Sequence, residues 1–209
     1  MRIMKSTGYI EFEIAAGEHI LHFYSSESQR LNVLTEFIKD GFKKRNKSVG
    51  VINKDDMYTV EDMLIKDDVD AGYYLIEGQL VFMAHEDCFA TGGNFDEERL
   101  IDVITGTINA ALRQGWAGAN IANDLTWAAT GSNVEAWLRF EANASNYIRT
   151  LPATCLCQYD ERIISGASIT NLIKTHPFVI IGDYIFENPY FISPKKYLKY
   201  YQHSEKYFA

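Results

Sequence analysis

The sequence predicts a three-layer α/β/α domain in which helices cover both faces of a mostly parallel sheet. Short apolar runs of strand type alternate with helix-type segments along nearly the whole chain. A helix between successive strands implies parallel pairing through a right-handed crossover. The 209 residues are 47% hydrophobic and 23% charged, which is ordinary for one globular domain with a single core.

The strands are predicted from apolar runs bounded by polar or turn residues. In chain order they cover residues 18–24, 49–52, 80–84, 118–124, 154–158 and 178–181, with a further edge strand at 183–186. The helices are predicted where apolar residues recur three or four positions apart, as Leu31, Leu34 and Ile38 do. They cover residues 27–46, 59–66, 96–114, 133–149, 165–174 and 194–201.

The turn after the first predicted strand lies where a phosphate-binding loop would be. Such a loop needs glycines, which let backbone N–H groups face the phosphates, and a lysine that neutralises them. Residues 25–31 contain neither glycine nor lysine, and Glu27 would repel a phosphate. Ser26 as N-cap and Gln29 three residues later form a capping box instead. We expect no tight Mg-ATP binding here, although the helix N-terminus could hold a smaller anion.

The composition argues against a nucleic-acid surface and against a membrane protein. The net charge is −8, whereas binding to a phosphate backbone draws on clustered Lys and Arg. No stretch approaches the roughly 18 apolar residues that a spanning helix needs. The start of the chain has no apolar leader, and the three cysteines are an odd number. These features predict a cytoplasmic protein in a reducing compartment.

Polar and aromatic side chains gather where the predicted strands end. The strand ends and the residues after them are 22–24, 85–87, 124–127 and 157–160. Ligands of open parallel sheets bind beyond the carboxyl ends of the strands. We therefore expect a ligand pocket at this edge, with at least one aromatic side chain in its wall.

A metal site is the weaker interpretation of the histidines and cysteines. His19 and His22 are three apart on a strand, so they point to opposite faces and cannot share one ion easily. Cys155, Cys157 and His176 could supply further ligands. The two cysteines are separated by one residue, unlike the C-x-x-C of common zinc sites. Buried, inert cysteine is the favoured interpretation, and we expect no metal.

The sequence leaves the roles of three further residues open. Cys157 could act as a nucleophile with a histidine base and with Asp160 or Asp124 as orienting group, but a core cysteine is favoured. Asp124 follows an apolar strand, as a metal-holding acid does in nucleotide hydrolases, or it is a turn residue. Glu141 lies in the middle of a helix and faces either the site or solvent.

Taken in order, several segments of the chain resemble the MEDS family, the methanogen/methylotroph DcmR-type sensory domain. The segments are 17–24, 76–80, 124–127, 140–141, 157–160, 176–177 and 187–190. The resemblance spans about residues 17–200, with 1–16 as an N-terminal lead and 201–209 as a C-terminal tail. Leu21 departs from the pattern, because many relatives carry cysteine there.

The resemblance implies a RecA/KaiC-like P-loop NTPase architecture without a functional Walker A loop. It also implies a non-catalytic sensor in signal transduction or transcriptional regulation, which binds a small hydrocarbon derivative of methylated or halogenated one-carbon type. Relatives are often fused to a DNA-binding or kinase region, and this chain shows neither. We therefore expect a homo-oligomer, or a separate kinase or transcription-factor partner, without direct contact to nucleic acid or membrane.

The expected ligand-binding residues combine the strand ends with the segments of the resemblance. They are His19, His22, Tyr24, Asp124, Trp127, Glu141, Cys157, Tyr159, Asp160 and His176. We expect no catalytic residue and no cofactor. The alternatives are a residual nucleotide-binding or ATPase-like module and a purely structural interaction domain.

Overall fold

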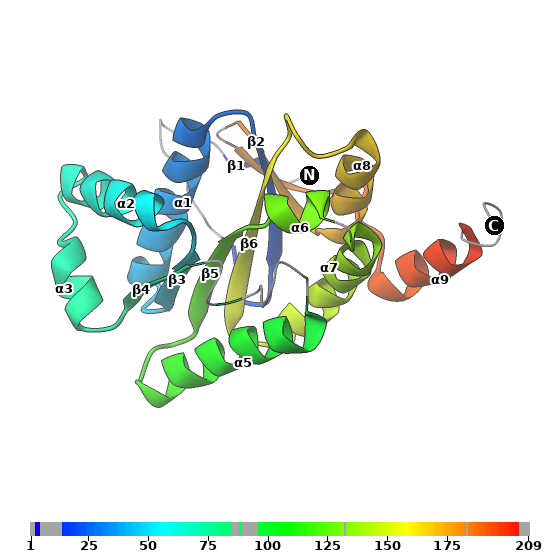
Figure 1. Cartoon of the computed structure of the whole chain (residues 1–209). Helices are drawn as coiled ribbons and strands as arrows, with labels where there is room; N and C mark the ends of the chain where they lie inside the picture. Colours follow the sequence, from blue (N-terminus) through cyan, green and yellow to red (C-terminus); the bar gives the residue numbers. More distant parts are fainter. Residues whose placement is uncertain are drawn as a thin grey trace.

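The described part of the chain forms an eight-stranded sheet with helices packed on both faces (Figure 1). The computed structural model describes residues 3–4, 14–84, 88, 96–131, 133–182 and 184–204. The strands are β1 Ile3–Met4, β2 His19–Tyr24, β3 Lys47–Val51, β4 Leu80–Met83, β5 Ala119–Asp124, β6 Ala153–Asp160, β7 Phe178–Ile181 and β8 Tyr184–Glu187. The helices are α1 Glu27–Lys43, α2 Lys54–Lys66, α3 Ala71–Ile76, α5 Glu97–Arg113, α6 Thr126–Thr130, α7 Val134–Ile148, α8 Gly166–Thr175 and α9 Pro194–Ser204.

The sheet has the strand order β1-β8-β7-β2-β6-β5-β3-β4. The neighbours from β7 to β4 pair in parallel, while β8 runs antiparallel to β7 and β1 antiparallel to β8. The predicted mostly parallel α/β fold is therefore confirmed. Strands β2 and β6 lie side by side in the middle of the sheet, and the residues of interest lie on both of their faces.

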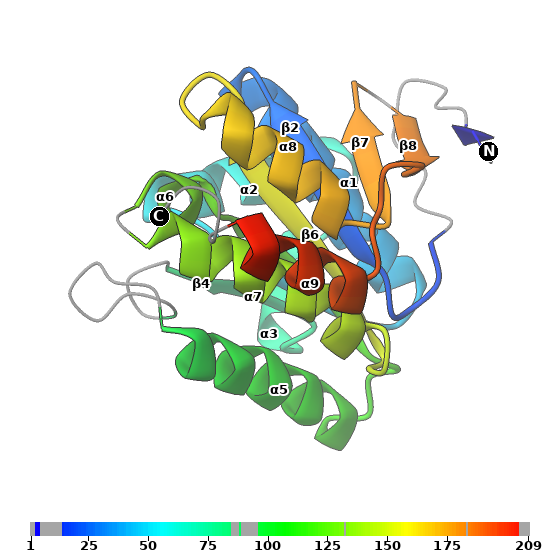
Figure 2. The ribbon, with the colours of Figure 1, turned by 90° about the vertical axis from the view of Figure 1, so that its right-hand side faces the viewer.

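Side chains from the central strands alternate between two hydrophobic cores. Helices α1, α2 and α3 cover one face, where Phe37 of α1 packs with Ile20 of β2. Helices α5, α7 and α8 cover the other face, where Trp137 of α7 packs with Leu21 of β2 (Figures 1 and 2). Because successive strand residues point to opposite faces, two residues an odd number of positions apart reach different cores.

The start of α1 confirms Ser26 as the predicted N-cap, but the return bond of the predicted capping box is shifted by one residue. Ser26 Oγ accepts a hydrogen bond from Gln29 N at 3.3 Å, and Gln29 Oε1 accepts one from Ser25 N at 3.0 Å. The return bond thus comes from the residue before the cap. Glu27 adds a negative charge in the first turn, which the positive end of the helix dipole favours. The turn after β2 is therefore closed by its own side chains.

The prediction missed the shortest elements. Helices α3 and α6 have six and five residues, too few to show a helical repeat in the sequence, and β1 has two. Helix α2 begins at Lys54 rather than at 59, and β6 extends over residues 153–160 rather than 154–158. The predicted strand end at 85–87 lies outside the described residues, as do most of the lead 1–16 and part of the tail 201–209.

Candidate functional site

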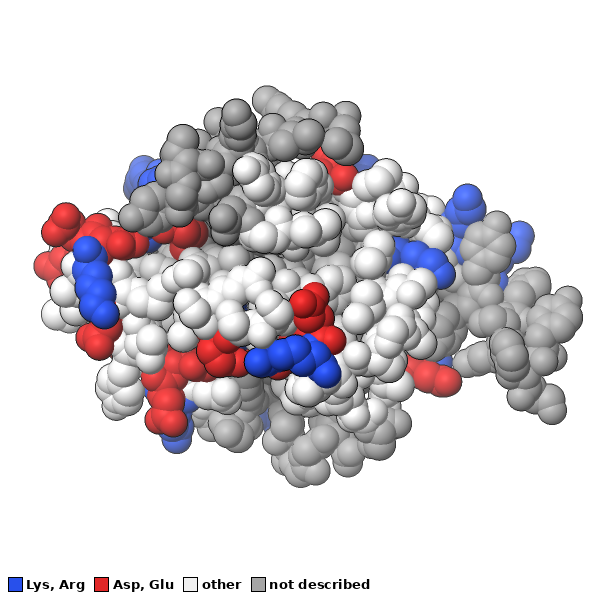
Figure 3. Space-filling view, turned by 90° about the horizontal axis from the view of Figure 1, so that it is seen from above, with Lys and Arg blue, Asp and Glu red and all other residues white. Residues whose placement is uncertain are grey.

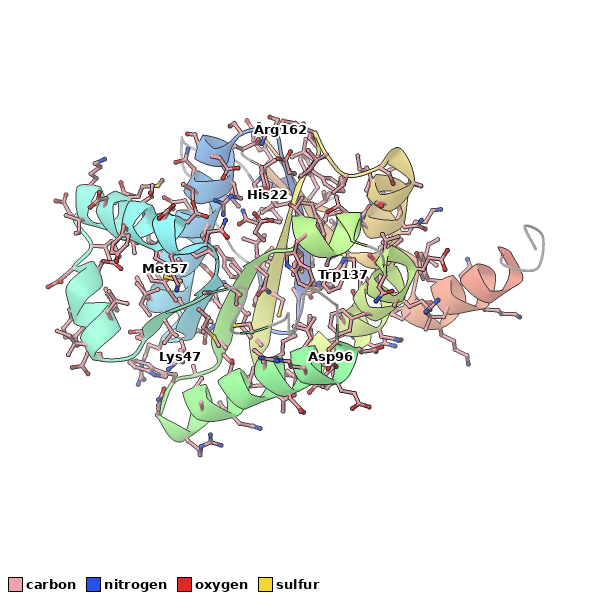
Figure 4. The ribbon with its side chains drawn as sticks, viewed as in Figure 1. His22, Lys47, Met57, Asp96, Trp137 and Arg162 are labelled. Carbon is pink, nitrogen blue, oxygen red and sulfur yellow. The ribbon has the colours of Figure 1, made fainter. Side chains whose placement is uncertain are left out.

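The structure divides the predicted site residues between the two faces of the sheet. His22, Tyr24 and Asp124 lie on the α1 face, and Asp160 lies at the end of β6. The α7 face holds His19, Glu141, Cys157, Tyr159 and His176. Trp127 lies beside Trp137 on that face, with ring centroids 6.5 Å apart. Figure 4 shows His22 and Trp137 on opposite sides of the central strands.

On the α1 face, a buried arginine lies next to the turn that connects β2 to α1. The Arg30 side chain is 2% exposed, and its Nη2 donates to Asp56 at 2.7 Å. Its Nε donates to Glu27 at 2.8 Å and lies 3.8 Å from Asp124 Oδ2. Burial alone would lower the pKa of Arg30, but the charges of Asp56 and Asp124 outweigh it and raise the pKa. We call Glu27, Arg30, Asp56 and Asp124 the Arg30 cluster.

Asp124 is held in this cluster by its own strand end. Its Oδ1 accepts from Thr126 N at 3.1 Å and from Thr126 Oγ1 at 2.8 Å, which is an Asx turn. Its Oδ2 accepts from the Tyr24 hydroxyl at 3.0 Å. Burial, and then the charge of Asp124, raise the pKa of Tyr24, so this hydroxyl stays a donor. Both carboxylate oxygens of Asp124 thus accept hydrogen bonds from the protein, as expected for a turn residue.

Two other predicted residues on or near this face have structural partners. Asp160 forms an ion pair with Arg162, with 2.5 Å between Nη2 and Oδ2, and this pairing lowers the pKa of Asp160. His22 Nδ1 accepts from Gln158 Nε2 at 2.9 Å, since that amide nitrogen can only donate. Burial, and then the charge of Arg30, lower the pKa of His22 to about 3. His22 is therefore neutral.

The surface above this region is not a basic one. Figure 3 looks onto the end of the molecule where Arg162 lies. Among the described residues visible there, Lys and Arg form no continuous patch, and Asp and Glu gather on the side of α1 and α2. A polyphosphate would meet mostly uncharged and acidic side chains at this edge.

On the α7 face, four buried side chains converge at the centre of the domain. We call His19, Glu141, Cys157 and His176 the core cluster; one ligand-type atom from each lies within 4.8 Å of all the others. His19 Nε2 is 3.1 Å from Cys157 Sγ and 3.2 Å from Glu141 Oε2. His176 Nε2 is 3.3 Å from the same Glu141 oxygen. The predicted separation of His19 from His22 is confirmed, since His22 lies on the other face.

The ionisation of the core cluster follows from its burial and its charges. Burial alone would raise the pKa of Glu141, but His176 and His19 outweigh it and hold the pKa below its usual value. Burial, and then His176, lower the pKa of His19 to about 4. Burial, and then the Glu141 charge, raise the pKa of Cys157 well above its usual value. The cluster thus combines a carboxylate with a thiol that is not a ready nucleophile.

The other oxygen of Glu141 is held by two aromatic residues. The Tyr159 hydroxyl donates to Glu141 Oε1, and Trp137 Nε1 donates to the Tyr159 hydroxyl at 3.2 Å. Glu141 is 1% exposed, which answers whether this helix residue faces the interior or solvent. Sequence reasoning included Glu141 and Tyr159 but missed that they form one chain of hydrogen bonds with Trp137.

A small cavity adjoins the core cluster. It has a volume of about 20 Å³, and we call it the core cavity. Its apolar wall includes Leu100 and Ile104 of α5 and Trp137, Phe140 and Ala144 of α7. Its polar lining comes from His19, Glu141, Cys157 and Asn123. The Oδ1 atom of Asn123 is buried and has no hydrogen-bond partner among the described residues. Two surface hollows of about 390 and 460 Å³ contain none of the predicted site residues.

Comparison with known proteins assigns the chain to a family. The profile of the MEDS family, "MEthanogen/methylotroph, DcmR Sensory domain", matches residues 18–177. The chain belongs to the MEDS family. The MEDS domain therefore carries all the residues of the core cluster and of the Arg30 cluster within the matched segment. No curated protein matches its sequence.

The fold of this MEDS domain is similar to that of a KaiC-like protein from the hyperthermophilic archaeon Pyrococcus horikoshii. The TM-score is 0.57 at 12% sequence identity, over 85% of this chain and 79% of the other. The similarity shows a shared RecA/KaiC-like architecture. Within the described residues, no helix is long and apolar enough to cross a membrane.

Sequence reasoning missed one important residue at each site, Arg30 in the Arg30 cluster and Ser145 beside the core cluster. Arg30 lies four and seven positions before Leu34 and Phe37, on the buried stripe of α1, and this spacing is the signal that would have indicated its burial. Ser145 lies one turn after Glu141 on α7, and its Oγ is 3.0 Å from His19 Nδ1. A single serine on a mostly apolar helix face is too common a feature to have indicated this contact.

Proposed function

We propose that this MEDS domain is a non-catalytic sensor that binds a small, largely apolar molecule in the core cavity. The observation that carries the proposal is the lining of this cavity. It is apolar on the α5 and α7 sides and polar at a few defined points, which is the usual make-up of a small-molecule site. The buried, unpartnered Oδ1 of Asn123 supplies an acceptor for an O–H or N–H group of a ligand.

The size of the cavity favours a one-carbon compound. A volume of about 20 Å³ holds roughly one water-sized group without movement of the walls. A methylated or halogenated one-carbon compound has two to four non-hydrogen atoms and would need only a small outward shift of α5. At a ceiling of about −1.5 kcal/mol per atom, three atoms give about −4.5 kcal/mol, so we expect dissociation constants of about a millimolar.

The Arg30 cluster supports a non-catalytic role. In a nucleotide hydrolase of this architecture, the turn before α1 would hold phosphates and a strand-end acid would hold Mg²⁺. Here Glu27 and Arg30 pair with each other, and Asp124 is engaged by Tyr24 and Thr126. A nucleotide would have to displace these contacts.

The signal is passed on through association, with a second copy of this chain or with a separate kinase or transcription factor. A ligand can shift such an equilibrium only if it binds one of two states better. Helix α5 contributes one wall of the core cavity and packs against β5, so its position is the feature that a ligand in the cavity would change.

A thermal-shift screen with a matched pair of variants tests the proposal. The panel comprises methanol, methylamine, methanethiol, dichloromethane and Mg-ATP, each at concentrations up to tens of millimolar. We expect at least one one-carbon compound to raise Tm, and Mg-ATP to leave it unchanged. Leu100→Phe, which fills the cavity, should abolish the shift, whereas Leu112→Phe at the exposed end of the same helix should retain it.

Two outcomes would overturn the proposal. One is a Tm shift with Mg-ATP that Asp124→Ala abolishes, which would favour a nucleotide site. The other is a response to one-carbon compounds that is the same in Leu100→Phe as in the wild type, which would place binding outside the core cavity. Light scattering with and without the best compound then shows whether binding changes the oligomeric state.

A further inference from the structure

The core cluster contains a buried contact between polar atoms that is unfavourable when both histidines are neutral. The two histidines point their Nε2 atoms toward the same carboxylate oxygen, Glu141 Oε2. Although His176 Nε2 and this oxygen are only 3.3 Å apart, neither has a hydrogen-bond partner among the described residues. Two lone pairs facing each other in a dry interior are unfavourable, so a positive charge is needed between them.

The tautomer of His176 is fixed by a backbone carbonyl. Its Nδ1 lies 2.8 Å from the carbonyl oxygen of Leu172, which can only accept a hydrogen bond. Nδ1 therefore carries the proton. In the neutral ring, Nε2 then carries an unprotonated lone pair, which is directed at Glu141.

The tautomer of His19 is fixed in the same way through a serine. The hydroxyl of Ser145 donates to the carbonyl oxygen of Thr175 at 2.6 Å, so its oxygen is left to accept from His19 Nδ1 at 3.0 Å. The Nε2 atom of the neutral His19 ring therefore also carries a lone pair. It faces Cys157 Sγ at 3.1 Å and Glu141 Oε2 at 3.2 Å.

These contacts are what a metal centre requires. Metal-bound histidines almost always donate their other ring N–H to a carbonyl or similar acceptor, and metal-bound carboxylates are themselves hydrogen-bonded, as Glu141 Oε1 is by Tyr159. From this arrangement we infer that His19 Nε2, His176 Nε2, Glu141 Oε2 and Cys157 Sγ bind a divalent transition-metal ion, Zn²⁺ in particular.

The donor set and the distances select the ion. Nitrogen, sulfur and one carboxylate suit Zn²⁺, whereas Mg²⁺ and Ca²⁺ prefer oxygen ligands alone. Bonds of about 2.0–2.3 Å in a tetrahedral site place ligand atoms about 3.3–3.8 Å apart. Three of the pairs here lie at 3.1, 3.2 and 3.3 Å, and all pairs lie within 4.8 Å. The largest separation needs to contract by about 1 Å, within the reach of side-chain rotation.

The charge balance is also favourable. Two neutral histidines, one carboxylate and one thiolate sum to −2, so a divalent ion makes the buried site neutral. Binding would release the thiol proton of Cys157 to solvent as the metal–sulfur bond forms. All four side chains are buried, so the ion enters during folding or local opening. The inference does not depend on whether a small molecule binds in the core cavity.

Metal analysis of the full chain tests the inference. The chain is expressed in zinc-supplemented medium, desalted and analysed by elemental mass spectrometry, and we expect close to one Zn²⁺ per chain. Refolding in Co²⁺ should give visible d–d bands of tetrahedral type and a near-ultraviolet thiolate-to-cobalt charge-transfer band. Cys157→Ser should remove the charge-transfer band. Cys155→Ser, a buried cysteine two residues earlier on the same strand, should retain it.

Three results would overturn the inference. One is a folded wild-type chain with less than about a tenth of an equivalent of metal after refolding with Zn²⁺ or Co²⁺. Another is a cobalt spectrum without thiolate charge transfer, which indicates a surface ion only. The third is loss of the band in Cys155→Ser with its retention in Cys157→Ser. Glu141→Gln provides a further isosteric variant, which should weaken metal binding at least tenfold if circular dichroism shows it folded.

Discussion

Acidification should destabilise the metal-free chain through two buried histidines. His22 and His19 have pKa values of about 3 and about 4, against an ordinary value of 6.5. Burial is the main cause in both, and the proximity of Arg30 adds to it at His22, as does the proximity of His176 at His19. Between pH 6.5 and these values, each ring is protonated in the unfolded chain and neutral in the folded one.

The sign and size of the effect follow from that difference. The unfolded chain binds more protons in this window, so the free energy of unfolding falls as the pH falls below 6.5. At pH 5 the loss is about 1.36 kcal/mol per unit over about 1.5 units, or roughly 2 kcal/mol for each histidine. Glu141 has a lowered pKa, so its stabilisation is lost only below its unfolded value of 4.5 and does not enter this range.

Urea denaturation followed by tryptophan fluorescence at pH 7 and pH 5 measures the effect. EDTA is included so that no metal competes with protons at His19. The wild type should lose about 4 kcal/mol between the two pH values, and His22→Gln about 2 kcal/mol relative to its own value at pH 7. Equal losses in both chains, or a wild type that is as stable at pH 5 as at pH 7, would show that His22 does not contribute to the pH dependence of stability.

Three further perturbations test the charge of the Arg30 cluster, the packing at glycines and the inferred metal site. Arg30→Met should lower the unfolding free energy by about 3–5 kcal/mol, because it leaves partly buried carboxylates without their counter-charge. Adding Asp124→Asn should recover part of that loss in a double-mutant cycle, and strict additivity would show that the two side chains are not coupled. Gly118→Ala should lower the unfolding free energy by about 1–3 kcal/mol, since its Cβ would lie 2.1 Å from a backbone carbonyl oxygen. The Cβ of Gly106→Ala in α5 meets nothing within 4 Å, so this variant should raise the unfolding free energy by about 0.5–1 kcal/mol. Equal Tm shifts for the two glycine variants would contradict this. Ser145→Ala should weaken Zn²⁺ binding about 10–100-fold in a chelator competition, because it removes the acceptor that orients a metal-binding histidine; an unchanged affinity would count against the metal site.

The sequence predicted what depends on local periodicity. Apolar runs and helical spacing located the longer strands and helices, because burial on one or two faces imposes those repeats. The capping residue Ser26 marked the start of α1 within one residue. The alternation of strand residues also predicted that His19 and His22 face different cores, because this depends on backbone geometry alone.

Contacts between distant elements could not be predicted in the same way. His19 and Cys157 are 138 positions apart, and they meet only because β2 pairs with β6 in one particular register. Glu141 reaches them through the packing of α7, and His176 through the end of α8 before a proline. The pairing order of strands and the rotation of helices about their axes leave no local pattern. The expected site residues were therefore grouped into one site, although they lie on two faces of the sheet.

We propose that the core cavity holds a small one-carbon ligand, and a crystal structure with a brominated example would locate that ligand directly. Dibromomethane scatters anomalously, which locates it independently of the protein density. We expect a bromine peak between Leu100, Trp137 and Phe140, adjoining the core cluster, and no such peak in Leu100→Phe. Bromine found only in a surface hollow, or at the turn before Arg30, would place the ligand outside the core cavity and overturn the proposal.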